Sequence, residues 1–501
     1  MNKMIGRSVA AGAVLITIFT IISKILGFFR EVLLANLFGT SWRLDAIIIA
    51  LTPSTVITGI ISGGLATIFI ARYIKTRDKN PEKAPEYVWG IFAVTAAIYI
   101  SFGLLLLFFS ESFVKLFAPG FNDEVLNYAA RKLNYLSILP LIIGLESLLA
   151  ALLRAERRFF RFAASQAVFN LFAIPIIFFT APYFSEASYI LAWILGNTAV
   201  VIIMLFSARD LVKPTKLIFS KEVRLTFILA SSLFLSSSLG NINKIVDKAF
   251  VSILPSGRIA GMHYATTLLG IISSIFITGL MMTTHTEMSE LISKKQFAKV
   301  QNRMEKTLDT IMRMAIPLVA WLTVMAGPLI QLIYEHGEFT SESTLIVQIA
   351  LIGYSATIII SPISGLASNY FYIQGKVRIA IYIALLSVGS NVLFDWLLIK
   401  PFGVGGITAA TSLVVFINAM VLSSLVKREG ISYVPWKRIG KLILISIILV
   451  STTLLLKMLP SPYYYLIIGN VAFALFIFFS ARDIIKTIII RSFGVIKRSG
   501  K

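Results

Sequence analysis

Cysteine is absent from the 501 residues, and histidine occurs only three times. The lack of cysteine excludes disulfides, thiolate nucleophiles and zinc sites built on cysteine. The histidines, His263, His285 and His336, are too scattered along the chain to suggest a metal cluster. Charged residues are also scarce, at 14% of the chain, whereas hydrophobic residues make up 57%. A soluble domain cannot cover so much apolar surface, so this composition indicates an integral membrane protein.

Long apolar stretches are what the sequence does contain. A hydrocarbon core of about 30 Å requires about 20 apolar residues per spanning helix, and roughly fourteen such stretches follow one another here. We expect spans near residues 8–28, 45–71, 87–110, 126–153, 161–181, 187–207, 225–252, 259–283, 308–334, 343–373, 377–399, 404–426, 439–459 and 463–481. The first stretch continues into Arg30 and Glu31 without a convincing cleavage site, so we interpret it as a span and not as a signal peptide. The predicted fold class is an all-α integral membrane protein.

The distribution of basic residues predicts the topology. Lys and Arg number 46 against 24 acidic residues, which gives a formal net charge of +22. If the N-terminus is cytoplasmic, 34 of the 46 basic residues fall in segments on the cytoplasmic side. Segments on the other side are often acidic, as in EHGEFTSES at residues 335–343. This positive-inside asymmetry predicts that both termini are cytoplasmic. The basic excess is then a topology signal, and no nucleic-acid partner is expected.

An internal repeat is also visible in the sequence. Three pairs of similar features have nearly the same offset in residue number: Arg43 and Arg258, Phe121 and Phe339, and Arg161 and Arg378. We therefore expect a parallel repeat, with six spans in an N-lobe at residues 1–215 and six in a C-lobe at 216–430. Two further spans and a basic cytoplasmic tail would occupy residues 431–501. A duplication of this kind favours a transporter whose central cavity opens alternately to each side.

Several short motifs resemble a known family. They are SKILGFFREVLLANLFGTSWRLDAIIIALTPS near the N-terminus, followed in family order by LFAPGF, AERRFFRFAASQAVFN, IVDKAFVSILPSGRIAGMHYA, LIYEHGEFT and GGITAATSL. In these motifs the chain resembles the MurJ (MviN) family, the lipid II flippases of the multidrug/oligosaccharidyl-lipid/polysaccharide exporter superfamily. The resemblance implies two six-helix lobes in a V shape. It also implies transport of a lipid-linked cell-wall precursor across the bacterial cytoplasmic (inner) membrane, from the inner to the outer leaflet.

Arg30 is the leading candidate for substrate binding. The diphosphate of a polyprenyl-diphosphate-linked glycolipid cannot remain in the hydrocarbon, so a hydrated cavity with cations must receive it. A guanidinium suits this role because it pairs with phosphate through two parallel hydrogen bonds. We expect Glu31 and Asp45 to hold the Arg30 cation when no substrate is bound. The resemblance implies the same roles, because an Arg–acid pair and an Asp occupy these positions in the family. The alternative is that Arg30 and Glu31 only anchor the helix at the interface.

The chain departs from the family pattern at three positions. The resemblance predicts a pair of arginines in the second span, where this sequence has Ile57 and Thr58, and an arginine in the eighth span, where it has Thr267. Two cationic contributions to a diphosphate site are therefore missing. These departures leave the identity of the lipid-linked substrate more open than the transport function.

Three other side chains could supply the missing charge. Lys244 and Lys248 lie on the seventh predicted span and His263 on the eighth. A structural role in an ion pair is the alternative for Lys244 and Lys248, and a packing role is the alternative for His263.

Buried acidic residues suggest energy coupling. Asp247 lies in the seventh predicted span, and Asn391 and Asp395 lie one turn apart on one face of the eleventh. Carboxylates deep in a bilayer require a partner, a proton or a cation, and oxygen ligands of this kind suit a hard cation such as Na⁺. The alternative is an ion pair between Asp247 and Lys244 or Lys248, with Asn391 and Asp395 in a packing network.

The resemblance adds two ligands to this site. Matching positions in some MurJ-like proteins bind Na⁺, and here Thr411 and the backbone carbonyl of Ile407 would complete the set. Transport would then use the inward Na⁺ gradient, with membrane potential or proton coupling as alternatives. We expect no other cofactor.

Three classes of function follow from the sequence. The first is a flippase for an undecaprenyl-diphosphate-linked precursor, with lipid II as the main candidate and a surface-polysaccharide repeat unit (O-antigen or exopolysaccharide) as the second. The others are a MATE-like cation-coupled exporter of small molecules and a non-transporting scaffold for cell-wall synthesis. We expect no enzyme activity, because no nucleophile–base pair, phosphate loop or catalytic metal motif is apparent. The expected partners are the glycolipid and membrane lipids around a monomer.

Overall fold

The structure is a computed structural model that describes residues 9–215, 219–458 and 466–482. Every regular element in these residues is helical, which confirms the predicted all-α fold class. Eight of the described helices are long and apolar enough to cross a membrane. A ninth is counted if α6 (Asp123–Leu136) and α7 (Leu139–Ala155) form one bent span. The total of fourteen spans stays a prediction.

The chain divides into two compact units, Met1–Gly261 with Tyr334–Ser343, and Met262–Ile333 with Thr344–Lys501. Besides α6 and α7, the first unit contains α2 (Val9–Phe38), α3 (Trp42–Lys79), η1 (Pro81–Lys83), α4 (Ala84–Phe108), α5 (Ser110–Phe117), α8 (Phe159–Phe184), α9 (Ala187–Ala208) and α10 (Lys221–Val251). The helix α11 (Arg258–Ser273) begins in the first unit and continues in the second. The second unit also contains η2 (Ser274–Thr278), α12 (Gly279–Ser293), α15 (Val377–Arg428), α16 (Trp436–Leu456) and the helix Leu466–Arg482. It contains all but the last residue of α13 (Phe297–Tyr334) and all but the first three of α14 (Ser341–Ile373).

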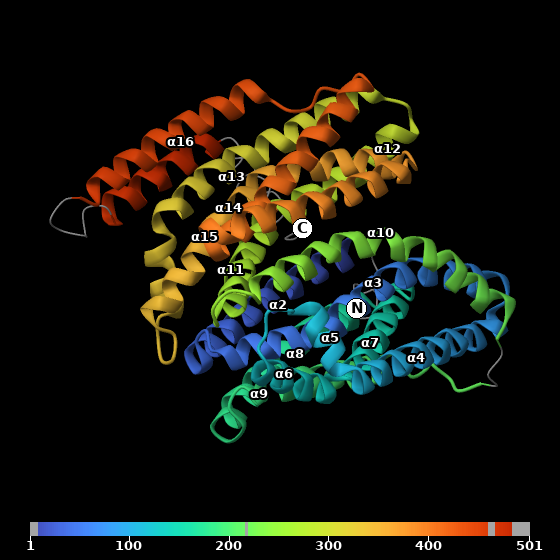
Figure 1. Cartoon of the computed structure of the whole chain (residues 1–501). Coiled ribbons are helices and arrows are strands. Elements are labelled where there is room, and N and C mark those ends of the chain that lie inside the picture. Colours follow the sequence, from blue (N-terminus) through green and yellow to red (C-terminus); the bar gives the residue numbers. More distant parts are fainter. Residues whose placement is uncertain (1–8, 216–218, 459–465, 483–501) are drawn as a thin grey trace, which may run out of the picture. The chain divides into compact units, whose positions relative to one another are not determined.

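The helix α3 lies at the centre of the first unit. The Ser41 side chain caps it by accepting a hydrogen bond from the backbone N–H of Leu44 at 3.2 Å. Its most apolar window is 67% buried, and it packs against α6, α7 and α10. Figure 1 shows α10 running along α3, which explains why the contacts group α10 with the first unit, although the predicted N-lobe ends at residue 215. Polar residues on the buried part of α3 therefore lie inside the first unit.

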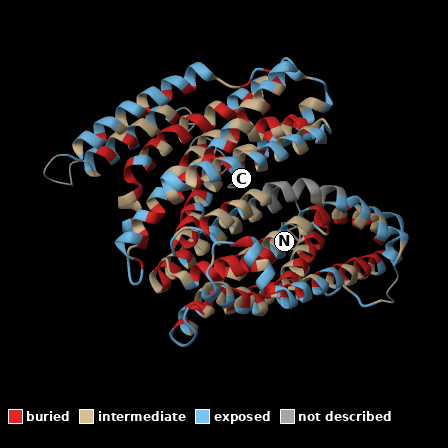
Figure 2. Cartoon of the chain, in the orientation of Figure 1, coloured by how far each residue is buried: buried red, intermediate tan, exposed pale blue. Residues whose placement is uncertain are grey.

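The core of the second unit joins α13, α14 and α15. Fully buried side chains from all three helices meet there, including Leu308, Leu366 and Leu422. The helix α16 is more exposed: only 22% of its apolar window is buried, and Figure 2 shows it mainly as exposed and intermediate residues. An apolar helix with so much exposed surface is suited to contact with lipid.

Two predicted spans contain breaks that hydrophobicity did not indicate. The predicted span 126–153 consists of α6 and α7, which are bent by 43°. The π-helix η2 interrupts the predicted span 259–283. The predicted boundary between the spans 377–399 and 404–426, in contrast, agrees with the structure, because α15 has non-helical angles at Gly403 (φ 55°, ψ −131°). Breaks of this kind redirect the chain without a loop.

The helix α2 is longer than the first predicted span, 8–28. It continues to Phe38, so Arg30 and Glu31 lie inside a continuous helix and not at its end.

Backbone geometry supports the predicted repeat. Positive φ angles occur at Gly39 (53°) and Gly257 (86°), and at Arg157 (54°) and Gly375 (72°). The two members of each pair have the same offset in residue number as Phe121 and Phe339. The same turns therefore recur at equivalent points of the two predicted repeats.

Candidate functional site

Arg30 and Glu31 form an ion pair within α2. The Arg30 Nη2 atom lies 2.5 Å from the Glu31 Oε1 atom, and the two side chains are 13% and 1% exposed. A cation and an anion so far from water stabilise each other only if both stay paired. The sequence correctly indicated this pair, because the two residues are adjacent in the chain.

Two residues of α8 complete the surroundings of Arg30, and sequence reasoning missed both. Its Nη1 atom donates to Asn170 Oδ1 at 3.2 Å, and its guanidinium lies 5.1 Å from the centre of the Phe169 ring. Asn170 is in turn fixed by its Nδ2 atom, which donates to the carbonyl of Ser23 at 3.1 Å. A buried amide in an otherwise apolar helix was the signal that could have identified Asn170.

The Nε donor of Arg30 is not used in these contacts. Among the residues that the structure describes, its buried Nε atom has no hydrogen-bond partner. A buried donor without a partner costs about 1–3 kcal/mol. An incoming anion that accepts from Nε would remove this cost, so the geometry suits an oxyanion ligand.

Asp45 has a different role from the one predicted. It is 3% exposed, and its carboxylate accepts hydrogen bonds from the backbone N–H groups of Gly257 at 2.5 Å and Ala260 at 2.7 Å. The prediction that Asp45 holds Arg30 is therefore wrong for this structure. The carboxylate instead receives N–H groups at the start of α11, where a helix presents unpaired donors and partial positive charge.

The replacement cations predicted for the missing arginines lie in both units. Lys248 donates from Nζ to Thr52 Oγ1 at 2.7 Å, which links α10 to α3 within the first unit. Lys244 is exposed on α10. His263 is half-buried in the second unit, with its ring 6.0 Å from that of Tyr264. A role in substrate binding stays a prediction for all three.

The positions where the family resemblance predicts arginine differ in their surroundings. Thr58 is fully buried and donates to the carbonyl of Ser54 at 2.5 Å, so this position lies in the packed interior of α3. Ile57 and Thr267 are half-buried. A long cation at position 58 would not fit the packing that this chain has adopted.

The predicted cation ligands are buried. Asp247 is 5% exposed in the first unit, and Asn391 (1%) and Asp395 (0%) lie on α15 in the second. The Asn391 Nδ2 atom donates to Asp395 Oδ2 at 3.2 Å, and Thr411 Oγ1 donates to the carbonyl of Ile407 at 3.2 Å. The described residues contain no group of three His, Cys, Asp or Glu side chains that could hold a metal ion. Any cation at α15 would therefore depend on amide, hydroxyl and carbonyl oxygens besides Asp395.

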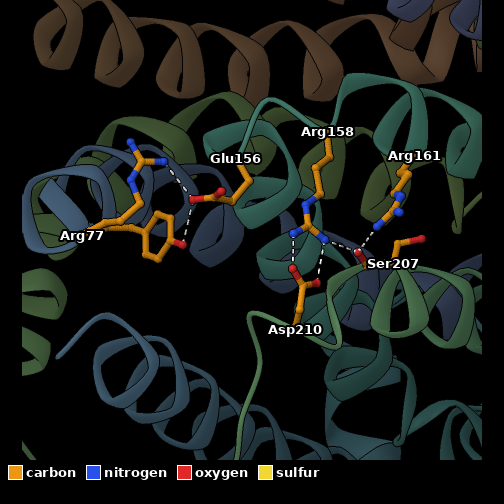
Figure 3. Close-up of polar contacts among 7 residues, drawn as sticks. Arg77, Glu156, Arg158, Arg161, Ser207 and Asp210 are labelled. Atoms are coloured by element: carbon orange, nitrogen blue, oxygen red, sulfur yellow. Dashed lines mark hydrogen bonds and ion pairs between the residues drawn. The ribbon is translucent and has the colours of Figure 1, made fainter. Parts of the chain in front are cut away.

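A polar cluster at the ends of α3, α7, α8 and α9 was not predicted (Figure 3). Glu156 follows α7 and accepts from Tyr73 Oη at 2.9 Å and from Arg77 Nη1 at 2.8 Å. Arg158 binds Asp210 through two hydrogen bonds, one of them 2.7 Å long. The hydrogen bonds from Arg158 hold the pKa of the Asp210 carboxyl below its usual value. The cluster thus fastens four helix ends of the first unit.

The second unit repeats part of this cluster. Lys376 and Glu429 form an ion pair that joins the two ends of α15, as Arg158 and Asp210 join α8 to the segment after α9. Lys376 has the same offset in residue number from Arg158 as Phe339 has from Phe121. The repeat thus preserves an electrostatic contact although both residue types have changed.

Comparisons with known proteins identify the family. The model of the family described as "Lipid II flippase MurJ" matches residues 34–481. The "Lipid II flippase MurJ" of Thermosipho africanus is 25% identical over 484 residues, which are 96% of this chain and 98% of the relative. A "Probable lipid II flippase MurJ" of Buchnera aphidicola is 26% identical over 426 residues, covering 83% of this chain and 82% of the relative.

Solved structures give the same result for the fold. A structure titled "Lipid II flippase MurJ, inward closed conformation" matches with a TM-score of 0.82 and 25% identity, over 94% of this chain and 100% of its own. An inward-facing MATE family transporter of the MOP superfamily matches with a TM-score of 0.69 at 15% identity, over 84% of this chain and 95% of its own. The second likeness shows the shared fold.

Proposed function

This chain belongs to the lipid II flippase MurJ family, and from this premise we propose that it moves lipid II across the bacterial cytoplasmic membrane, from the inner to the outer leaflet. The observation that carries the proposal is the family match over residues 34–481. The protein is accordingly a multi-pass membrane transporter with a lipid-linked substrate. It would act in peptidoglycan synthesis as a monomer, without chemical change to the substrate, with both termini in the cytoplasm.

Arg30 is the residue that we assign to the diphosphate. It lies just before the matched residues, so its assignment depends on its own geometry: a cation held by Glu31, Asn170 and Phe169, with Nε unpartnered among the described residues. A diphosphate would compete with the Glu31 carboxylate for the guanidinium and would also accept from Nε. The Arg30 guanidinium could then exchange between two anionic partners, the Glu31 carboxylate and the diphosphate.

We assign the coupling cation to the polar residues of α15, with Na⁺ as the first candidate. Asp395 is fully buried and bonded to Asn391 within an apolar helix. A carboxylate in such surroundings is stabilised by a bound cation or by a proton. Ile407 and Thr411 of the same helix remain proposed ligands, and a role for Asp247 of the first unit stays a separate prediction. The test is transport by reconstituted protein in Na⁺ and in choline: rates that are equal in both would remove Na⁺ from the mechanism.

Growth rescue of a strain depleted of its lipid II flippase tests the main proposal. The wild-type chain should restore growth, Arg30→Ala should not, and Arg30→Lys should restore it weakly because the charge remains without the planar fork. Wild-type protein that reaches the membrane and fails to rescue would contradict lipid II as the substrate. Rescue by Arg30→Ala at wild-type level would contradict only the role of Arg30.

A second candidate substrate is another lipid-linked oligosaccharide, such as a surface-polysaccharide repeat unit. The observation that favours it is the absence of arginine at Ile57, Thr58 and Thr267. Binding of lipid II and of a polyprenyl-diphosphate repeat unit to the same purified protein would separate the two candidates.

A further inference from the structure

A basic cleft lies in the second unit, at the point where α16 begins near α13. Its volume is about 660 Å³, and its lining includes Trp436, Lys437 and Lys441 of α16 together with Glu305 of α13. The segment before α16 is fixed in place, because the buried Tyr433 donates from Oη to the carbonyl of Ile363 at 2.8 Å. The fold of the second unit therefore holds this side of the cleft in place.

The charge around the cleft is positive. Arg438 also lines it, and its Nη1 atom lies 2.5 Å from Asp309 Oδ1, but Asp309 also binds Arg313 at 2.9 Å. One carboxylate thus faces two guanidinium groups, and the Arg438 side chain is still 55% exposed. Lys437 and Lys441 are exposed as well. The start of α16 adds the partial positive charge of a helix N-terminus.

An apolar stripe continues from the cleft along α16. Lys437, Lys441, Leu444 and Ile448 follow at spacings of four, three and four residues, which places them on one face of the helix. Leu444 and Ile448 are 60% and 58% exposed. Trp436, at the first position of the helix, is 52% exposed, and Trp is typical of the membrane–water interface.

We propose that this cleft binds the phosphate headgroup of an anionic phospholipid and that the acyl chains lie along the exposed stripe of α16. The order of features matches such a lipid, with cations at the interface and apolar surface below. A soluble anion would use only the first part of this surface. The basic segments place this end of α16 on the predicted cytoplasmic side, where anionic lipids attract Lys and Arg. The proposal does not depend on the transported substrate.

Binding of phosphatidylglycerol and phosphatidylcholine to the purified full-length protein, measured by native mass spectrometry, tests the proposal. The wild type should retain phosphatidylglycerol preferentially. Lys437→Gln/Lys441→Gln should weaken that binding about thirtyfold, since each surface lysine contributes about 1 kcal/mol. The variant Lys437→Arg/Lys441→Arg should bind as the wild type does. Unchanged unfolding temperatures would show that all variants are folded.

Lys75→Gln/Lys79→Gln is the matched control, because these two exposed lysines have the same spacing on α3 and the same predicted membrane side. An equal loss in both double variants would mean general surface attraction and would overturn the site. Unchanged binding in Lys437→Gln/Lys441→Gln would also overturn it. Competition by inorganic phosphate or by an acidic peptide at the concentration at which the lipid binds would overturn the assignment to a lipid.

Discussion

Ser185 and Gly403 have the same backbone conformation and occupy equivalent positions of the two repeats. The φ and ψ angles are 50° and −136° at Ser185, and 55° and −131° at Gly403. Glycine tolerates a positive φ, whereas a side chain is strained there. Ser185 directly follows α8, and Gly403 lies at the corresponding break inside α15. The break is therefore a property of the repeated unit, which each repeat achieves with a different residue.

Gly403→Ala should destabilise the protein by about 1–3 kcal/mol. An added Cβ at Gly403 would meet no atom within 4 Å, so the expected cost comes from the backbone and not from a steric clash. Thermal unfolding in detergent measures the effect. Gly389→Ala in the same helix is the control: it also has open space but no positive φ, and Ala there should be neutral or stabilising by up to about 1 kcal/mol. Equal shifts in both variants would contradict the strain argument.

Asp45→Asn should destabilise the first unit by about 1–3 kcal/mol. The carboxylate of Asp45 accepts two backbone N–H groups, whereas an amide retains one acceptor and turns a donor toward the other N–H. The unfolding temperature of the purified protein measures the loss. The control is Asp78→Asn on the same helix, because Asp78 is 60% exposed and its ion pair with Arg77 contributes little. A loss no larger than that of the control would mean that the two N–H groups find other acceptors.

Asn170→Ala should lower transport about tenfold while leaving the protein folded, because it removes a hydrogen bond to the charged group of Arg30. Asn170→Asp should lower transport further, because a second carboxylate would compete with the diphosphate for Arg30. Flipping of labelled lipid in proteoliposomes provides the measurement. The control is Asn197→Ala, since this buried asparagine donates to Trp193 of its own helix. If Asn170→Asp transports at the wild-type rate, Arg30 does not need to leave its resting partners.

The sequence predicted the helices well and their breaks poorly. Apolar length identified α9 at Ala187–Ala208 and α14 at Ser341–Ile373 to within two residues of the predicted spans 187–207 and 343–373. Hydrophobicity does not report the direction of the chain, however, so it could not indicate the bend between α6 and α7 or the π-helix η2. These breaks depend on a few local dihedral angles, which leave no trace in the apolar pattern.

The candidate site shows the same limit. The ion pair of Arg30 and Glu31 could be predicted because the residues are neighbours in the chain. The contact with Asn170 depends on the packing of α2 against α8, which is distant in sequence. The partners of Asp45 are backbone N–H groups, which every residue except proline carries. Side-chain chemistry could therefore identify Asp45 as important but could not identify what it binds.

Acid should weaken the attachment of α8 to the segment after α9. Arg158 donates to Asp210, and these hydrogen bonds lower the pKa of Asp210 below the usual 3.8. A carboxyl whose pKa is lower in the folded than in the unfolded state stabilises the fold at pH values above its unfolded-state pKa. This contribution is lost as the pH falls through the folded-state pKa. The effect should be small, because Asp210 is 56% exposed.

Unfolding temperatures of the wild type and Asp210→Asn between pH 3 and pH 6 test this linkage. The wild type should be the more stable at pH 6, and the difference should shrink below about pH 4, where the unfolded carboxyl takes up its proton. Asp123→Asn at the exposed start of α6 serves as the control for the loss of one negative charge. A difference between wild type and Asp210→Asn that stays constant down to pH 3 would show that Asp210 contributes through its shape and not through its charge.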